Sequence, residues 1–356
     1  MTRVLVLMGG RSGEHDVSLV SARGVMEALA TTALDTVPVR IGREGAWTRD
    51  GRPVGLCAGP DGRALLVALD GAEEPLPVDV VFPVLHGPYG EDGTVQGLCE
   101  MAGVAYVGAG VAASSVAMDK ALFKTLALAH DLPVAEAVVL TATDLADQPA
   151  AVRAEIAHSV GYPCFVKPAR LGSSLGISRV AGAEALDAAL DAAFAHDDKV
   201  LVERAITGRE VEVGVLGADG DLVVSPPGEI RYEGEWYDYA TKYEAGRAEL
   251  VVPADMPPEV AARTADLAAA AFTMVGCHGL ARVDFFVTAA GEVLVSELNT
   301  MPGFTPTSAY PSLMAAAGVP YPEVVARLVA LARSRHARSA APRDARPAGA
   351  APAPPA

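Results

Sequence analysis

The sequence predicts a multidomain protein of mixed α/β and α+β class, with an α/β domain first and two α+β domains after it. The first observation is length: 356 residues, of which 51% are apolar, suffice for two or three cores of ordinary size. The second is an alternation of short apolar runs and helical patterns near the N-terminus, typical of a parallel sheet covered by helices. The third is a set of alternating segments beyond Gly208, typical of antiparallel strands.

The first predicted domain covers residues 1–115. Residues 4–8 are apolar and end at Gly9 and Gly10, as expected for a buried parallel strand, and residues 17–30 carry a helical pattern of apolar positions. Further short runs predict more strands in this domain, at residues 37–41, 80–85 and 104–107.

The central predicted domain covers residues 116–207. A helical pattern runs over residues 112–130 and ends before Pro133. Strands are expected at residues 164–167 and 199–203, on either side of another helix.

The third predicted domain covers residues 208–335. Antiparallel strands are expected at residues 211–216 and 222–225, and a hairpin around Gly291 is expected to join residues 281–287 to 292–298.

The end of the chain is predicted to change from helix to disorder. Val324, Leu328 and Leu331 form the apolar stripe of a last helix. Residues 336–356 are rich in Ala, Pro and Arg and have nothing to bury, so they are expected to be a disordered tail.

Composition and charge exclude several classes of protein. The formal net charge of -16 would repel a nucleic-acid backbone, and no apolar stretch approaches the roughly 20 residues that span a bilayer. The start lacks a signal-peptide core. The cysteines are far apart in the sequence and suit a reducing compartment: Cys57, Cys99, Cys164 and Cys277. A cytoplasmic protein without nucleic-acid or membrane partners is therefore expected.

One glycine motif permits an alternative function. Gly108-Ala-Gly110-Val-Ala-Ala113 follows a predicted strand and precedes a helix, which matches a dinucleotide-binding fingerprint and would suit a dinucleotide-dependent oxidoreductase. The fingerprint also needs an acidic residue at the end of the next strand, whereas Asp131 follows a helix without an intervening strand. We therefore interpret the glycines as residues of a tight strand-to-helix turn.

A lysine and a flexible loop indicate phosphate binding. Lys167 lies at the end of a predicted strand and is followed by Gly172-Ser173-Ser174-Leu-Gly176, which offers hydroxyls and backbone amides. Such loops cradle phosphates, although a glycine-serine stretch can also be a plain connector.

Four polar residues are predicted to converge on neighbouring strands. Arg282 and Asp284 share one face of a strand, and Glu297 and Asn299 share one face of the next. Carboxylate and amide oxygens suit Mg²⁺ that also binds substrate phosphates. The alternative is a solvent-facing strand side, but the intervening Val283 and its counterpart Leu298 point toward a core, which favours a functional site.

Two glutamates bracket the junction between the second and third predicted domains. Glu203 and Glu210 are either surface charges or acceptors for the ribose hydroxyls of a nucleotide held between the two domains.

These elements, in this order, resemble the ATP-grasp superfamily, and the flanking motifs resemble the D-alanine:D-alanine ligases over nearly the whole chain except the tail. The motifs are Gly9-Gly10-Arg-Ser-Gly-Glu14-His-Asp-Val-Ser18, His86-Gly-Pro-Tyr-Gly-Glu91-Asp92-Gly93, Met118-Asp-Lys120, the loop from Lys167 to Gly176, Tyr237-Asp-Tyr-Ala-Thr-Lys242-Tyr243 and Glu297-Leu-Asn299-Thr-Met-Pro-Gly303-Phe-Thr-Pro-Thr-Ser308. The resemblance implies an N-terminal Rossmann-like domain followed by the two ATP-grasp subdomains.

The resemblance also implies a set of nucleotide and metal ligands. ATP, the co-substrate, would be bound by residues of both subdomains, with Lys242 reaching its γ-phosphate: Lys120, Lys167, Ser173, Ser174, Glu203, Glu210 and Lys242. Two Mg²⁺, for which Mn²⁺ can substitute, would be held by Asp284, Glu297 and Asn299.

Substrate contacts are implied in the same way. Glu14 would take the ammonium of the first D-alanine with help from His86, and Ser18 would belong to the same substrate site. The catalytic residues would be Glu14, Ser173, Tyr243 and Arg282, with Arg282 and the Gly303 backbone stabilising the oxyanion. Ser308 would hold the carboxylate of the second D-alanine.

The implied reaction is ATP-dependent ligation of two D-alanines through D-alanyl phosphate, for peptidoglycan precursor synthesis, by a homodimer. A loop at residues 232–246, closed by Tyr243 hydrogen bonding toward Ser173 and Glu14, would exclude water. Related ligases take D-serine or D-lactate as the second substrate, and Tyr243 favours D-alanine. A nucleotide-binding regulator without catalysis remains an alternative.

Overall fold

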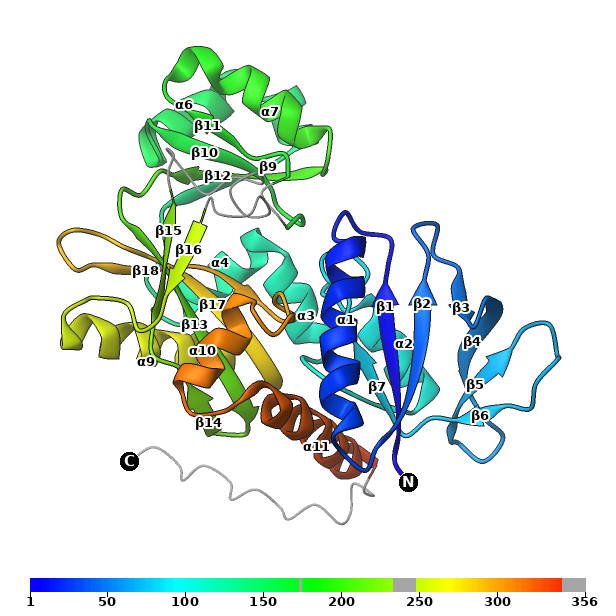
Figure 1. The fold of residues 1–356 in the computed structure, drawn as a ribbon. Helices are drawn as coiled ribbons and strands as arrows, with labels where there is room; N and C mark the ends of the chain where they lie inside the picture. Colours follow the sequence, from blue (N-terminus) through cyan, green and yellow to red (C-terminus); the bar gives the residue numbers. More distant parts are fainter. Residues whose placement is uncertain (173–174, 233–247, 341–356) are drawn as a thin grey trace, which may run out of the picture.

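A computed structural model of the protein describes residues 1–172, 175–232 and 248–340. Their strands form three sheets of eight, four and six strands. Figure 1 shows the eight-stranded sheet beside the six-stranded sheet, with the four-stranded sheet at the top of the view. The predicted mixture of α/β and α+β architecture is confirmed.

The eight-stranded sheet has the order β6-β5-β4-β3-β2-β1-β7-β8. β1 is parallel to β2 and β7, and β7 is parallel to β8, whereas β2 to β6 pair in antiparallel fashion. Its elements are β1 (Arg3–Gly9), α1 (His15–Ala30), β2 (Asp35–Ile41), β3 (Trp47–Arg49), β4 (Arg52–Ala58), β5 (Ala64–Ala68), β6 (Leu76–Pro77), β7 (Val80–Pro83), α2 (Thr94–Ala102) and β8 (Ala105–Tyr106). The four strands predicted from apolar runs are confirmed, and β3 to β6 were not predicted.

β1 is buried on both faces, which explains its continuous apolar run. Val4 and Val6 belong to the same buried cluster as Val25 of α1, whereas Leu5 belongs to the cluster that contains Cys99 of α2. Because successive side chains of a strand point to opposite faces, α1 and α2 cover the two sides of this sheet.

The four-stranded sheet is antiparallel, in the order β11-β10-β12-β9. Its elements, with the helices that lead into it, are α3 (Val111–Met118), α4 (Lys120–Ala129), β9 (Ala137–Thr141), α5 (Ala142–Asp147), α6 (Pro149–Ser159), β10 (Cys164–Pro168), β11 (Ser178–Val180), the 3₁₀ helix η1 (Ala183–Ala185), α7 (Leu186–Phe194) and β12 (Lys199–Arg204). Cys164 and Val166 of β10 pack under α6 and α7, so the alternate positions Phe165 and Lys167 face the opposite side of the sheet.

The six-stranded sheet has the order β16-β15-β13-β17-β18, with β14 paired to β13. Its elements, with the helices that follow, are β13 (Arg209–Ala218), β14 (Asp221–Val224), β15 (Gly228–Tyr232), β16 (Ala248–Val251), α9 (Pro258–Met274), β17 (Gly279–Val287), β18 (Val293–Asn299), α10 (Ala309–Ala316) and α11 (Tyr321–Ala340). The predicted hairpin is confirmed as β17 and β18, in which Arg282 lies opposite Asn299 and Asp284 lies opposite Glu297.

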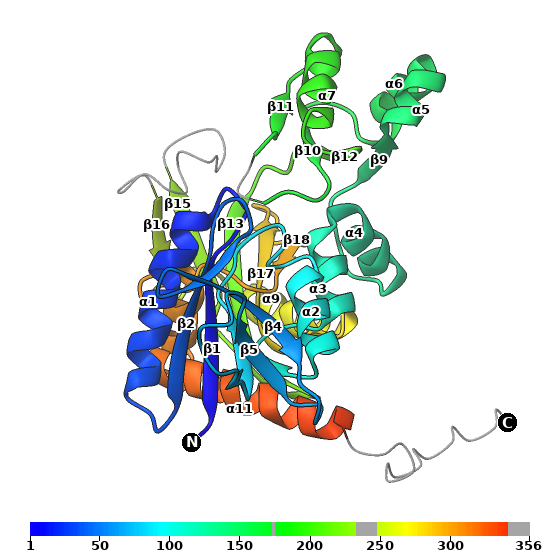
Figure 2. The same ribbon diagram turned by 90° about the vertical axis from the view of Figure 1, so that its right-hand side faces the viewer.

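The first and last regions of the chain share one core. Val25 of α1 and Phe82 of β7 belong to the same buried cluster as Leu280 of β17, Tyr310 of α10 and Val325 of α11. Figure 2 shows α11 running beneath the N-terminal sheet and the C-terminal strands. The N-terminal sheet is therefore fixed against the C-terminal sheet, while the four-stranded sheet extends away from both.

The last helix is confirmed and is longer than predicted. α11 continues to Ala340, so the disorder expected from residue 336 is wrong for residues 336–340. Residues 341–356 lie outside the described structure. Among the described residues, no single helix has the length and apolar composition to cross a membrane; α10 and α11 meet that test only as a pair, which is bent by 97°.

The helix predicted over residues 112–130 is two helices. Asp119 has extended backbone angles, with φ -91° and ψ 98°, and separates α3 from α4. Its carboxylate accepts hydrogen bonds from the N–H groups of Ala121 and Leu122, so the break also caps α4. The apolar periodicity continues through this point, which is why the sequence pattern does not reveal the break.

The motif at Gly108 forms a tight turn. Gly108 has φ +96°, and its carbonyl accepts a hydrogen bond of 2.7 Å from Arg335 of α11. A side chain at Gly279 would come within 3.3 Å of the Gly108 backbone. These glycines therefore permit close packing beside α11, in agreement with our interpretation of the motif as a turn.

Candidate active site

Two cavities meet between the three sheets. The larger cavity, of about 710 Å³, lies between the N-terminal and C-terminal sheets, and the smaller cavity, of about 280 Å³, lies between the four-stranded and C-terminal sheets. They share wall residues, which are Lys120, Leu171, Gly172, Glu212, Arg282 and Glu297. A ligand in one cavity would therefore approach a ligand in the other along these residues.

The larger cavity contains most of the substrate-binding residues that the resemblance implies. Glu14 lines it from the turn before α1, His86 from the loop after β7, Arg282 from β17, and Gly303 and Ser308 from the segment between β18 and α10. These positions are far apart in sequence, so the fold brings the predicted set together.

Glu14 fits into the cavity wall because its neighbours lack side chains. A Cβ atom at Gly87 would lie 2.9 Å from the Glu14 carboxylate, and one at Gly172 would lie 3.7 Å from it. Gly87 also has φ +72°, which favours glycine. The carboxylate thus lies between the loop after β7 and the start of the loop after β10.

His86 is held by protein groups on both ring nitrogens. Nδ1 lies 2.8 Å from the Met301 carbonyl and Nε2 lies 3.1 Å from the Ser21 hydroxyl. Because a carbonyl only accepts, Nδ1 carries the proton and Nε2 accepts from Ser21. Burial lowers the pKa of His86 despite the nearby Glu14 charge, so the ring is neutral and orients the segment that leads to Gly303.

Glu91 is a further functional candidate. It belongs to the motif that begins at His86, but the sequence alone indicates no role for it. Its carboxylate accepts hydrogen bonds from the N–H groups of Gly87, at 2.7 Å, and Met301, at 2.9 Å. Burial and the nearby Glu14 raise the pKa of Glu91 to about 8, against those hydrogen bonds and Arg282. Its position in that motif was the one sign of a role in the sequence. Its burial near the Glu14 carboxylate depends on the fold and could not be predicted from the sequence.

Arg282 lies at the shared wall between two carboxylates. It donates to Asp284 through Nε and Nη2, both at 2.7 Å, and its Nε lies 3.3 Å from Glu212. Burial opposes its charge, but Asp284 and Glu212 outweigh burial and raise its pKa well above the ordinary value. Arg282 is therefore a fixed positive charge between the cavities.

The predicted metal ligands are neighbours in the hairpin of β17 and β18. Asn299 donates to Asp284 at 3.0 Å, and Glu297 lies opposite Asp284 in the strand register. Among the described residues no group of three or more His, Cys, Asp or Glu side chains is placed to hold a metal ion. The donor set is two carboxylates and one amide, which fits Mg²⁺ because this ion usually keeps waters and binds substrate phosphates.

A buried ion-pair network forms the inner wall of the smaller cavity. Lys167 Nζ lies 2.6 Å from one oxygen of Glu203, and Lys124 Nζ lies 2.9 Å from the other. Burial alone would raise the pKa of Glu203, but Lys167 and Lys124 lower it to about 2. Lys124 is a second residue that the sequence interpretation missed, because a lysine within a helical pattern gives no signal of its burial.

The other walls of the smaller cavity combine apolar and polar groups. Phe165, Ile177 and Phe286 line it together with Glu210, which accepts a hydrogen bond of 2.8 Å from Tyr232. Small-molecule sites typically combine apolar and aromatic walls with polar groups that orient the ligand.

Lys120 connects this cavity with the candidate metal site. Its Nζ donates to the Leu171 carbonyl at 2.6 Å and lies 3.5 Å from Glu297.

The structure places Ser18 outside the larger cavity. Its side chain is fully buried, and its hydroxyl accepts from the Gly9 N–H and donates to the Val84 carbonyl. It joins the ends of β1 and β7, so the expected substrate contact is replaced by a structural one. The remaining predicted residues, Ser173, Ser174, Lys242 and Tyr243, lie outside the described residues.

Comparisons with known proteins match nearly the whole chain. A family model described as "D-ala D-ala ligase N-terminus" matches residues 3–109, and one described as "D-ala D-ala ligase C-terminus" matches residues 126–330. A D-alanine–D-alanine ligase A from Mesorhizobium japonicum is 46% identical over 94% of this chain and 98% of its own. A D-alanine–D-alanine ligase from Deinococcus radiodurans is 48% identical over 93% of this chain and 98% of its own.

Solved structures agree with these matches. The D-alanine–D-alanine ligase from Coxiella burnetii has a TM-score of 0.83 at 33% identity and covers 95% of both chains. The VanG D-Ala:D-Ser ligase from Enterococcus faecalis has a TM-score of 0.83 at 35% identity and covers 93% of this chain and 99% of its own.

Proposed function

This chain belongs to the D-alanine–D-alanine ligase family, and we infer from that membership that it joins two D-alanine molecules, converting ATP into ADP and phosphate. The product, D-alanyl-D-alanine, serves the synthesis of peptidoglycan precursors.

The observation that carries the assignment is the shared wall of the two cavities. We assign the two D-alanines to the larger cavity and ATP to the smaller one, with the γ-phosphate at the wall formed by Lys120, Arg282 and Glu297. Phosphoryl transfer depends mainly on positioning and on neutralising phosphate charge. Lys167 and Lys120 supply part of that charge, and the apolar walls at Phe165 and Phe286 suit the adenine ring.

The proposed metal site uses Asp284, Glu297 and Asn299. Two Mg²⁺ bound there, or Mn²⁺ in their place, would neutralise phosphate charge and orient the γ-phosphate. Asp284 is already held by Arg282 and Asn299, so these side chains keep its carboxylate at the end of the smaller cavity.

In the first step a carboxylate oxygen of the first D-alanine attacks the γ-phosphorus of ATP. The bond from that phosphorus to ADP breaks, which gives D-alanyl phosphate. Glu14 binds the ammonium of this D-alanine, and His86 supports the site by holding the Met301 carbonyl. Arg282 and the Gly303 N–H stabilise the negative charge on the reacting carboxyl group.

In the second step the amine of the other D-alanine attacks the carbonyl carbon of D-alanyl phosphate. The bond from carbon to the phosphate oxygen breaks, phosphate leaves, and the nitrogen loses a proton. Ser308 binds the carboxylate of this second D-alanine. Its hydroxyl lies 2.7 Å from the Thr305 hydroxyl and accepts from the Thr305 N–H, which holds it at the cavity wall.

The assignment of this activity is tested by mixing the purified protein with ATP, Mg²⁺ and either D-alanine or L-alanine. Phosphate release and the product mass would be measured. We expect phosphate and a dipeptide with D-alanine alone. ATP binding without D-alanine-dependent turnover would contradict the assignment and favour a nucleotide-binding regulator.

D-serine is the specific rival for the second substrate, because the VanG structure, titled a D-Ala:D-Ser ligase, fits this fold as well as the D-alanine ligase structure does. Tyr243, which favours D-alanine in our interpretation of the sequence, lies outside the described residues. Competition between D-alanine and D-serine or D-lactate near neutral pH, followed by product mass, would separate the three.

Three further assignments complete the proposal. The protein acts in the cytoplasm, it forms a homodimer, and its domains are divided near residues 115 and 207. Light scattering tests the second, because a mass equal to that of one chain would contradict it. Limited proteolysis tests the third, since cleavage should first occur close to those junctions.

A further inference from the structure

The start of the loop after β10 is fixed by backbone hydrogen bonds to two other elements. The Ala169 N–H donates to the Lys199 carbonyl of β12 at 3.0 Å, and the Ala169 carbonyl accepts from the Lys120 N–H of α4 at 2.9 Å. Lys120 Nζ then reaches the Leu171 carbonyl at 2.6 Å. Lys120 therefore contacts this loop through both its backbone and its side chain.

The N-terminus of α4 is fully occupied by these contacts. The first N–H groups of a helix have no partner within the helix. In α4 the Lys120 N–H binds Ala169, the Ala121 and Leu122 N–H groups bind the Asp119 carboxylate, and the Phe123 N–H binds the Asp119 carbonyl. These amides are therefore not available for a phosphate, and the Lys120 side chain is the group that α4 offers to one.

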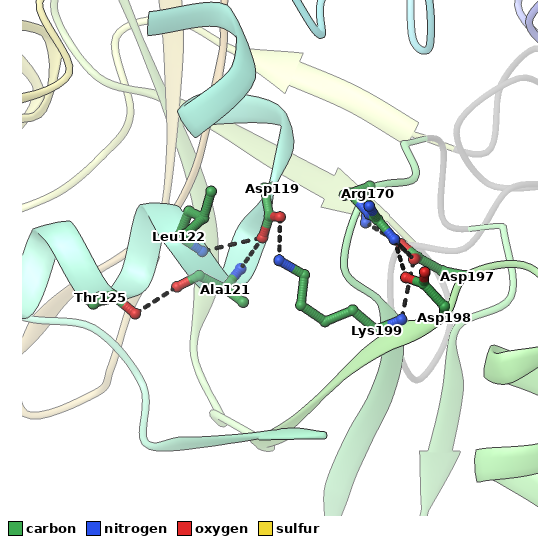
Figure 3. Close-up of polar contacts among 8 residues, drawn as sticks. All are labelled: Asp119, Ala121, Leu122, Thr125, Arg170, Asp197, Asp198 and Lys199. Carbon is green, nitrogen blue, oxygen red and sulfur yellow. Dashed lines mark hydrogen bonds and ion pairs between the residues drawn. The ribbon is translucent and has the colours of Figure 1, made fainter. Parts of the chain in front are cut away.

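An ion pair closes the arrangement into a ring. Lys199 Nζ contacts the second carboxylate oxygen of Asp119, as Figure 3 shows. The ring runs from Asp119 to Lys199 through their side chains, from the Lys199 carbonyl to Ala169, and from Ala169 to the Lys120 backbone beside Asp119. The Asp119 side chain is 7% exposed and that of Lys199 is 23% exposed, so water screens this pair less than a surface pair.

A second set of contacts strengthens the same place. The Arg170 N–H donates to Asp197 at 2.8 Å, and the Lys199 N–H donates to the same carboxylate at 3.1 Å. The Arg170 guanidinium also contacts Asp197 and Asp198 (Figure 3). The described start of the loop is thus tied to the start of β12 on one side and to α4 on the other.

We propose that Asp119 and Lys199 are positioning residues for ATP, which fix the Lys120 ammonium and the start of the phosphate loop relative to the metal site at Glu297. The inference rests on the proposed function, because that function assigns Lys120 and the loop to the phosphates. Loss of the ion pair frees α4 and β12 to move apart at Ala169. Lys120 then samples positions away from Glu297, while the part of the larger cavity that Glu14, His86 and Ser308 line, which is built from other elements, is unchanged.

The test compares Lys199→Met with the wild-type protein in steady-state kinetics. We expect KM for ATP to rise about tenfold, which corresponds to about 1.4 kcal/mol, with kcat and KM for D-alanine changed by less than about twofold. Lys199→Arg should restore KM for ATP, because it keeps the positive charge. A KM for ATP that Lys199→Met leaves unchanged, or a parallel rise in KM for D-alanine, would overturn the inference.

Two controls separate positioning from a general loss of stability. Arg153→Met removes an exposed ion pair of 2.9 Å to Asp187 beside the same sheet, far from the loop, and should leave KM for ATP unchanged. Asp119→Asn keeps a side chain that caps a helix well but loses the charge that faces Lys199. It should therefore raise KM for ATP by the same factor as Lys199→Met, and it provides the test if Lys199→Met folds poorly.

The outcome also distinguishes this inference from the family function. If the wild-type protein showed no D-alanine-dependent turnover, the family function would fail. The dissociation constant of MgATP, measured by calorimetry for the wild type and Lys199→Met, would still decide whether the ion pair positions the nucleotide site. Equal constants would overturn the inference.

Discussion

The pKa of a buried glutamate is shifted in opposite directions in the two cavities. In the smaller cavity, Glu203 lies between Lys167 and Lys124, and these lysines lower its pKa to about 2 despite burial. In the larger cavity, Glu91 accepts hydrogen bonds from the N–H groups of Gly87 and Met301, and burial together with the nearby charge of Glu14 raises its pKa to about 8. The same side chain is held charged in one cavity and is favoured as neutral in the other.

This difference indicates which ligand charge each cavity favours. Two carboxyl groups close together in the larger cavity favour a ligand that brings a positive charge, such as the ammonium of an amino acid. In the smaller cavity Lys167 and Lys120, with Arg282 at the shared wall, supply positive charges for the phosphates of a nucleotide.

The largest effect is expected at Glu297. Glu297→Ala removes a carboxylate of the proposed Mg²⁺ site, so we expect ADP release to fall by on the order of 10³-fold or more. The side chain is 28% exposed, so the melting temperature should change little. Glu292→Ala, an exposed position in the turn of the same hairpin, is the matched control and should keep full activity. Normal turnover by Glu297→Ala would remove Glu297 as a metal ligand.

The next effect concerns stability in the smaller cavity. Lys124→Met leaves the buried Glu203 with one lysine, and we expect a loss of about 3 kcal/mol in the free energy of unfolding, measured with urea. Glu203→Gln should also destabilise the protein, because it leaves two lysines close together. The double variant should lose less than the sum of the single variants. Additive losses would show that these charges are not coupled and would weaken the contrast with the larger cavity.

The sequence was sufficient for the elements with strong periodic patterns. The continuous apolar run of β1 and the alternation in β17 and β18 follow from burial on two faces and on one face, respectively. The strands β3, β4 and β6 were missed because Arg, Gly or Pro interrupts their patterns, whereas β5 is a five-residue apolar run that was passed over. The break at Asp119 was missed because the apolar period continues across it.

The site was predictable where polar residues share a strand face, as Arg282 and Asp284 do. It was not predictable where a role depends on tertiary neighbours. Ser18 lies within a motif of the larger cavity but points into the junction of β1 and β7. The roles of Lys124 and Glu91 can be recognised only in the folded protein, where a carboxylate lies near each of them.

The smallest change for each step of its measurement is the pH dependence that Glu91 contributes to stability. Because its pKa rises from about 4.5 to about 8 on folding, the folded protein keeps a proton that the unfolded chain loses. The stabilisation from Glu91 is complete below about pH 4.5 and is lost as pH rises toward 8, with a slope of at most about 1.4 kcal/mol per pH unit. Urea unfolding at several pH values should therefore show Glu91→Gln gaining stability relative to the wild type as pH rises through this window.

Glu14→Gln sharpens this measurement, because Glu14 is the second cause of the shift after burial. Without the Glu14 charge the pKa of Glu91 should fall, and the slope attributed to Glu91 should become shallower. The ammonium of D-alanine should act in the same direction, since a positive charge beside Glu91 favours its ionised form. Binding of D-alanine near pH 7 should then release protons, which calorimetry in two buffers of different ionisation enthalpy detects. Equal proton release by the wild type and Glu91→Gln would assign those protons to another group and remove the charge contrast between the cavities.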